Sequence, residues 1–184
     1  MKKSLYIAVP AVLLALVMLH LANRKSQEQV VVSSSSDKPG WVWENPYTFN
    51  KVTIPGQWRK TQAKQVKDTL LALAHESGKS VVYIIYETSK NALSLKEYVD
   101  LMKTANHQEL GTSDFEKRSD KDGQEYYYAG GAKYFGDNLV NTSVRIWSDK
   151  ADHFWRMVSM TNGDYEELDY DAKQVEDLLY QSSR

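Results

Sequence analysis

The chain has 184 residues, no cysteine and a formal net charge of −1, a length that suits one globular core. Residues 38–184 carry 19 Lys and Arg against 22 Asp and Glu, and this near-neutral balance argues against a nucleic-acid partner, which requires a basic face. The absence of cysteine excludes disulfide bonds, which fits an exported bacterial protein without disulfides and equally a cytosolic one.

An uncharged, mainly apolar run of 18 residues extends from Leu5 to Ala22, after a short basic start. At about 1.5 Å of rise per residue, a helix of this length spans about 27 Å, close to the thickness of a bilayer core. We therefore interpret residues 1–25 as a single-pass membrane anchor.

A cleaved signal peptide is the alternative interpretation of this segment. Cleavage after Ala22 would place the bulky, polar His20 where a small residue is preferred, and Arg24 and Lys25 follow at once, so we favour an uncleaved anchor. Basic residues flank the run on both sides, so the positive-inside rule is nearly balanced. The early basic start favours an inner-membrane protein whose soluble domain lies in the periplasm.

Residues 26–40 are predicted to form a flexible linker. They include four consecutive serines at 33–36 and end in Asp-Lys-Pro-Gly. Such a segment buries too little apolar surface to order itself. The soluble domain is therefore expected at 41–184.

The domain opens with an aromatic, turn-rich segment at 41–47. Trp41 and Trp43 fall on one face of it, where they either cover the edge of a core or form an exposed aromatic lip for a partner. Residues 48–54 alternate loosely and end at Pro55-Gly56, which predicts a strand closed by a turn.

Two strands are predicted at 69–75 and 80–86, paired antiparallel around a turn at 76–79. The second strand is apolar on both faces, which is typical of a central strand covered on both sides.

A helix is predicted from Ser94 to about Ala105. Ser94 and Glu97 form a capping box, with serine at the N-cap and glutamate three residues later. The apolar residues that follow recur at helical spacing and define one buried stripe: Leu95, Tyr98, Val99 and Met102.

Four further strands and a final helix are predicted in the second half. The strands are expected at 115–118, 124–129, 139–147 and 153–161, and the helix at 168–180. Gly130-Gly131 is expected to break or bulge the second of these strands. Runs of strands with separate helices predict an α+β fold, with a mostly antiparallel sheet flanked by helices.

These elements resemble the PsbP/DcrB-like superfamily over about residues 46–183. The resemblance rests on the corner Ile54-Pro55-Gly56-Gln57-Trp58, the buried strand before a capped helix, and the late long strands before a C-terminal helix. It implies an α-β-α sandwich used for binding or assembly rather than catalysis, and it carries over no catalytic residue. DcrB-like envelope proteins are often lipoproteins, so the apolar helix would here replace the lipid.

No catalytic, cofactor-binding or metal-binding motif is evident. The four histidines lie on different segments without metal-ligand spacing, and a G-x-S-x-G elbow is absent. The acidic stretch 164–171 lacks the spacing of a calcium loop and is interpreted as the start of a helix. We therefore expect no enzyme activity, no cofactor and no bound metal.

Aromatic residues are the remaining candidates for a binding site. Three consecutive tyrosines begin at Tyr126, and further aromatics fall on neighbouring predicted strands. Packing within the core is the simpler interpretation, and an exposed patch is the functional one. The candidate partner-binding residues are Trp41, Trp43, Tyr126, Tyr127, Tyr128, Trp147 and Trp155.

These observations predict a membrane-anchored, non-catalytic envelope protein that binds another protein, as an accessory component of a secretion or envelope-assembly system. An immunity protein that neutralises a secreted toxin fits the same features. A hydrolase or small-ligand-binding protein is the third hypothesis, which a polar pocket with convergent carboxylates would favour.

Overall fold

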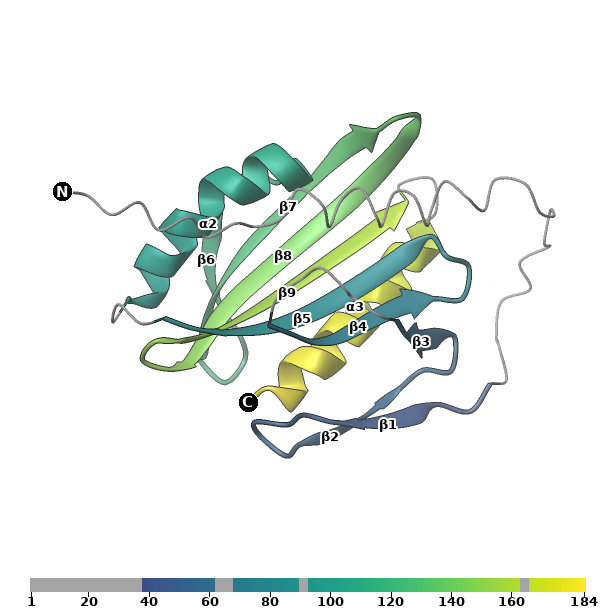
Figure 1. Cartoon of the computed structure of the whole chain (residues 1–184), viewed down its shortest axis with the longest axis horizontal. Helices are drawn as coiled ribbons and strands as arrows, with labels where there is room; N and C mark the ends of the chain where they lie inside the picture. The colour runs from purple at the N-terminus through teal and green to yellow at the C-terminus, as the bar shows by residue number, and fades with distance from the viewer. Residues whose placement is uncertain (1–37, 62–67, 90–92, 163–165) are drawn as a thin grey trace.

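The computed structural model describes residues 38–61, 68–89, 93–162 and 166–184. They form a seven-stranded sheet, a separate two-stranded hairpin and two helices (Figure 1). The predicted anchor and most of the predicted linker lie outside these residues. Among the described residues, none of the helices is both long and apolar enough to span a bilayer.

Every neighbouring pair of strands in the large sheet is antiparallel. Two meanders build the sheet, and they join where β5 pairs with β9. In spatial order the strands are β3 (Trp58–Lys60), β4 (Thr69–His75), β5 (Ser80–Thr88), β9 (His153–Asn162), β8 (Asn138–Lys150), β7 (Glu125–Phe135) and β6 (Glu116–Ser119).

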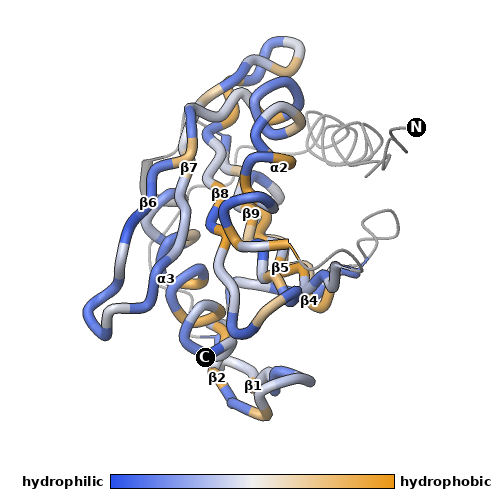
Figure 2. The backbone as a smooth tube through the Cα atoms, turned by 90° about the vertical axis from the view of Figure 1, so that its left-hand side faces the viewer, coloured by the Kyte–Doolittle hydropathy of each residue, from blue (hydrophilic) through white to orange (hydrophobic). Residues whose placement is uncertain are grey.

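The two helices cover opposite faces of this sheet (Figures 1 and 2). Helix α2 (Leu95–Leu110) packs on one face, and α3 (Glu166–Ser182) packs on the other. The hairpin of β1 (Trp41–Glu44) and β2 (Lys51–Ile54) lies beside α3 and completes that core. The α+β prediction, with an antiparallel sheet between helices, is therefore confirmed.

Residues of strand β8 contribute to two hydrophobic cores, one on each face of the sheet. Val144 and Ile146 belong to the cluster beneath α2, whereas Trp147 belongs to the cluster beneath α3. Strand β5 is buried on both faces, with Val82 toward α3 and Tyr83 toward α2. The prediction of a central, doubly covered strand paired with 69–75 is confirmed.

Helix α2 begins as predicted but ends later than expected. The capping box is present, because the Glu97 N–H donates to Ser94 Oγ at 3.3 Å and the Ser94 N–H donates to Glu97 Oε2 at 2.8 Å. The helix continues past Ala105 to Leu110, whose side chain is buried in the core. It ends at Gly111, whose φ of 68° suits a left-handed cap.

The glycine pair does not break strand β7, so the predicted interruption at 130–131 is wrong. The strand runs continuously through both residues. A Cβ at Gly131 would lie 2.1 Å from the carbonyl oxygen of Gly111, and Thr112 forms an isolated bridge with Gly131. Glycine is needed at 131 because the chain leaving α2 passes directly over the strand.

The predicted strand at 48–54 is also shorter than expected. Strand β2 starts only at Lys51, because Phe49 takes a left-handed backbone conformation with φ of 61°. A residue in that conformation cannot continue a β-ladder. Residues 45–50 instead form the hairpin tip, closed by the Asn45 N–H donating to the Asn50 carbonyl at 2.9 Å.

Candidate partner-binding surface on the β1–β2 hairpin

A row of aromatic side chains crosses the layer between the sheet and α3. Trp147 and Trp155 stack with ring centroids 6.1 Å apart, and Tyr180 of α3 meets Trp147 edge-on at 4.9 Å. Tyr86 lies 4.5 Å from Trp155 and 4.0 Å from Tyr47 of the hairpin. The row therefore joins the helix, the sheet and the hairpin tip.

Burial keeps the phenols of Tyr86 and Tyr180 neutral at physiological pH. Burial raises the pKa of Tyr86 to about 12, and burial likewise raises the pKa of Tyr180. The Tyr180 hydroxyl donates to Asp120 Oδ2 at 2.9 Å, which links α3 to the β6–β7 turn. The aromatic row thus behaves as an uncharged core.

Three of the candidate tryptophans are core residues. Trp43, Trp147 and Trp155 are buried between the sheet, the hairpin and α3. Trp147 and Trp155 are at most 1% exposed, and Trp43 is 8% exposed. Trp41 is partly buried and donates its indole N–H to the Trp58 carbonyl at 2.8 Å. In this structure β1 turns its tryptophans inward, to cover the core edge.

The three candidate tyrosines alternate across β7, as a strand requires. Tyr126 and Tyr128 face the α3 layer, paired in register with Trp147 and Arg145, whereas Tyr127 packs against the α2 core. All three are half-buried. They contribute to packing on two different faces, so the structure does not bring them together with β1 as one surface.

Three exposed large hydrophobic residues lie on the hairpin, and the others in the described part of the chain are Leu101, Tyr134 and Tyr170. Val42 is 64% exposed, Tyr47 52% and Phe49 71%. We call these three residues the hairpin patch. The sequence pattern missed Tyr47 and Phe49, because exposure at a turn depends on what packs beside it. The turn-forming Asn45-Pro46 next to them was the available signal.

Phe49 is unfavourable for stability in two respects. A bulky residue in the left-handed region costs about 1–2 kcal/mol relative to an ordinary conformation. Its exposed ring recovers little of this by burial. Strained, exposed residues of this kind are concentrated at functional positions.

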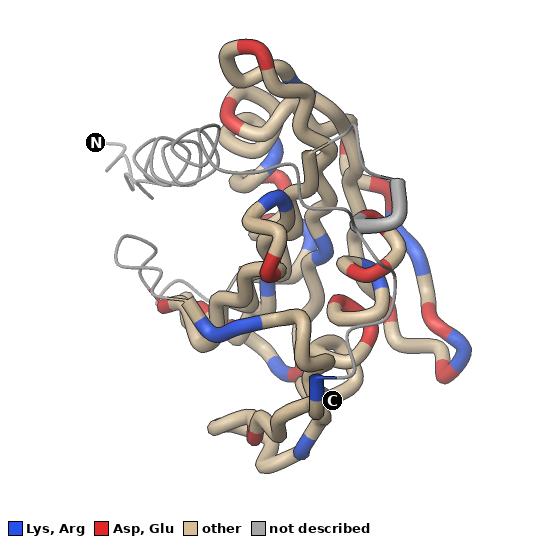
Figure 3. Tube along the Cα trace, turned by 90° about the vertical axis from the view of Figure 1, so that its right-hand side faces the viewer, with Lys and Arg blue, Asp and Glu red and all other residues tan. Residues whose placement is uncertain are grey.

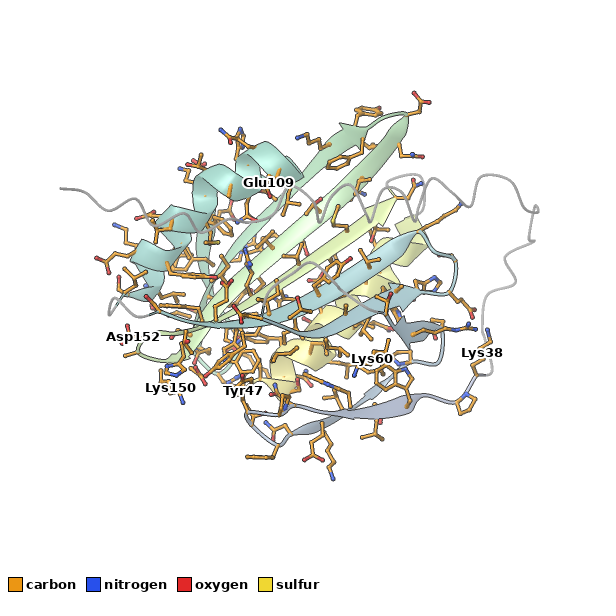
Figure 4. All side chains as sticks on the ribbon, in the orientation of Figure 1. Lys38, Tyr47, Lys60, Glu109, Lys150 and Asp152 are labelled. Atoms are coloured by element: carbon orange, nitrogen blue, oxygen red, sulfur yellow. The ribbon has the colours of Figure 1, made fainter. Side chains whose placement is uncertain are left out.

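The hairpin tip is firmly held despite this strain. The Thr48 hydroxyl donates to the Ser182 carbonyl at 2.5 Å, and the Asn50 side-chain amide donates to the Arg184 carbonyl at 2.6 Å. Tyr47 lies between the tip and the sheet (Figure 4), in contact with Tyr86. The patch is therefore presented by a preorganised element.

Charges on the outer face of the hairpin are paired. Lys51 Nζ lies 3.1 Å from Glu44 Oε2, and these two residues are cross-strand neighbours. Val42 and Thr53 form the adjacent outward pair. Elsewhere along the described part of the chain, Lys and Arg residues are interspersed with Asp and Glu residues (Figure 3). An apolar patch with a charge-balanced polar border is typical of protein–protein interfaces.

Comparisons with known proteins give likenesses in structure alone. No protein-family model and no curated protein matches the chain. A protein from Bacteroides thetaiotaomicron VPI-5482 is 8% identical with a TM-score of 0.47, over 74% of this chain and 46% of that one. The chain thus spans less than half of that protein's length. LpqN of Mycobacterium tuberculosis, a protein involved in cell envelope biogenesis, is 11% identical with a TM-score of 0.45, over 80% of this chain and 86% of that one.

Proposed function

We propose that this chain is a membrane-anchored, non-catalytic envelope protein whose hairpin patch binds another protein. The observation that supports this most strongly is Phe49, an exposed aromatic residue in a left-handed conformation on a rigid hairpin. Its side chain lowers stability without packing inside the fold, which is explained if a partner buries it.

The partner that suits this surface offers an apolar pocket for the Phe49 ring. Aromatic anchors that insert into such pockets provide most of the energy of many interfaces. The paired Glu44 and Lys51 beside the patch form a neutral border, so electrostatic attraction contributes little to this contact.

The position of the hairpin in the chain supports a partner close to the membrane. Strand β1 directly follows the predicted linker. A flexible linker of this length has a root-mean-square span of about 20 Å. If residues 5–22 cross the inner membrane with the domain in the periplasm, the hairpin lies within reach of other envelope components. We therefore favour an accessory role in a secretion or envelope-assembly system.

The layered architecture also supports the resemblance to the PsbP/DcrB-like superfamily. A sheet between two helices is the arrangement that the resemblance implies, and it agrees with a role in binding or assembly. Assignment to that superfamily is part of this proposal.

Site-specific photocrosslinking in living cells tests the proposal. A benzoylphenylalanine at position 49 of the full-length chain is expected to give one discrete adduct that mass spectrometry identifies as an envelope protein. The matched control places the same group at Tyr134, an aromatic residue that is 68% exposed at the end of β7. Equal adducts from both positions, or none from position 49, would contradict the proposal. A secreted toxin as the only adduct would replace the assembly role by immunity.

A further inference from the structure

A pocket of about 160 Å³ lies between α3 and strands β7, β8 and β9. It is on the sheet face opposite α2 and shares no residue with the hairpin patch. The residues that matter for its chemistry are Tyr128, Gly130, Ser143, Ser159, Lys173 and Glu176.

Glu176 reaches into this pocket from α3 and is only 4% exposed. Its Oε1 accepts hydrogen bonds from the Ser143 hydroxyl at 2.8 Å and from the Ser159 hydroxyl at 2.5 Å. The serines are register partners on β8 and β9, so two strands point donors at the same oxygen. The other carboxylate oxygen, Oε2, accepts no hydrogen bond from the described part of the chain.

Burial of the Glu176 side chain is costly for the fold. Burial raises the pKa of Glu176, and the two serine hydroxyls and Arg145 only partly oppose this. A packing role alone would be filled better by an apolar residue of similar size. A ligand that donates to Oε2 would satisfy the free oxygen and balance its charge.

The remaining charges around the pocket are unequal. Asp169 adds a second carboxylate, whose Oδ2 accepts a hydrogen bond from the Asn141 side chain at 2.9 Å. Lys173 lines the pocket, is exposed, and forms no ion pair with the residues that the structure describes. With Glu176 ionised, two carboxylates face one ammonium group across the lining, and this net negative charge favours a cationic ligand.

Gly130 keeps part of the pocket open. A Cβ at this position would lie 3.4 Å from the Tyr128 hydroxyl oxygen, an ordinary contact distance. Gly130 is not among the glycines with positive φ, so the backbone does not require glycine. At Gly131, by contrast, glycine is required because the backbone of Gly111 approaches too closely for a Cβ. The absence of a side chain at Gly130 therefore leaves room in the pocket that Glu176 also lines.

We propose that this pocket binds a small primary amine, whose ammonium group donates a hydrogen bond to Glu176 Oε2. An ammonium group offers three donors and no acceptor, which matches the carboxylate oxygens of Glu176 and Asp169. A water molecule in the liquid occupies about 30 Å³, so the pocket takes a ligand of only a few heavy atoms. A metal ion fits less well, because no group of three or more candidate ligands from His, Cys, Asp and Glu occurs in the part of the chain that the structure describes.

Titration of the detergent-solubilised full chain with ethylammonium chloride tests the site by NMR. Saturable shifts of the Ser143, Ser159 and Glu176 amide signals with one-to-one stoichiometry are expected. Sodium propionate has a similar size and the opposite charge, and it should produce no saturable shift. Equal binding of both probes, or no saturable binding of ethylammonium, would overturn the proposal.

Three variants locate the binding. Glu176→Gln retains an acceptor for the serines but removes the charge, and it should weaken ethylammonium binding at least about tenfold. Gly130→Ala adds a methyl group to the pocket wall without changing its charge and should also weaken binding. Lys173→Gln removes the one ammonium group from the lining and should strengthen ethylammonium binding, because that group repels a cationic ligand. Full binding by both Glu176→Gln and Gly130→Ala would overturn the assignment, and a thermal melt of each variant checks its fold.

A free amine and the phosphatidylethanolamine headgroup both carry this ammonium group. Bicelles that contain phosphatidylethanolamine, compared with bicelles of phosphatidylcholine alone, distinguish the two sources. If only the bicelles with phosphatidylethanolamine displace ethylammonium, the ligand is a lipid headgroup. If neither kind of bicelle displaces it, the ligand is a free amine.

Discussion

Tyr47 at the tip of the β1–β2 hairpin packs against Tyr86 on strand β5, with ring centroids 4.0 Å apart. This contact connects the exposed hairpin patch to the aromatic row inside the fold. Tyr47 also meets Trp155 edge-on at 6.0 Å, so its ring rests on two buried aromatics. The hairpin is therefore stabilised by the same core that supports α3.

Loss of the Tyr47 ring should loosen the hairpin. Tyr47→Ala is expected to lower the free energy of unfolding by about 1–2 kcal/mol, because it removes two aromatic contacts and part of the buried area. Urea denaturation measures the change. The control Tyr134→Ala removes a similarly exposed ring and should change stability by less than about 0.5 kcal/mol. Equal effects of the two variants would show that the Tyr47 contacts contribute nothing.

Phe49→Gly should separate stability from partner binding. Glycine adopts the left-handed conformation without steric cost, so the variant is expected to gain about 1 kcal/mol of stability. The same variant should no longer recover the partner in cells, because the anchor ring is gone. Phe49→Tyr retains the ring and should still recover it. A Phe49→Gly variant that keeps the partner would remove Phe49 from the proposed interface.

Glu176 should make the domain less stable as the pH rises. Its pKa is raised above the ordinary value of 4.5, so the folded state holds this proton to a higher pH than the unfolded state does. Its contribution to stability therefore decreases as the pH rises from about 4.5 through the folded pKa. Glu176→Gln should flatten this dependence and melt at least as high at neutral pH. The melting temperatures of both proteins are measured between pH 4 and 8. If the two proteins show the same dependence on pH, the prediction is wrong.

His75 should act in the opposite direction. Burial lowers the pKa of His75 below 6.5, and Asp171, 3.8 Å away, only partly opposes this. The unfolded state therefore binds the proton more readily, and stability is lost as the pH falls from about 6.5 through the folded pKa. His75→Gln should remove this loss, as measured by urea denaturation at pH 7.5 and 5.5. An unchanged difference between the two pH values would assign the loss to other groups.

The two adjacent glycines of β7 should respond differently to alanine. Gly131→Ala places a methyl group against the Gly111 carbonyl and should lower stability by about 1–3 kcal/mol. Gly130→Ala meets only an ordinary contact and should be neutral or stabilising, because glycine is unfavourable within a strand. Urea denaturation of both variants checks the contrast. Similar losses would mean that the two positions share one structural constraint.

The sequence alone determined the order and type of most elements, because the signals for them act over a few residues. The capping box at Ser94 and Glu97 located α2, and side-chain alternation identified the two faces of β8. The turn at 76–79 paired β4 with β5. Each of these features depends on hydrogen bonds or steric contacts between neighbours in the chain.

Only the tertiary structure decided which aromatic residues are exposed. Alternation assigns Trp147 to one face of its strand, but helices cover both faces of this sheet, so either face is buried. Trp43 points inward because the β1–β2 hairpin packs beside α3, whose residues lie more than 120 positions away in the chain. The strained exposure of Phe49 and the meeting of Glu176 with two serines arise in the same way. Burial and site geometry are set by long-range packing, which local sequence patterns do not encode.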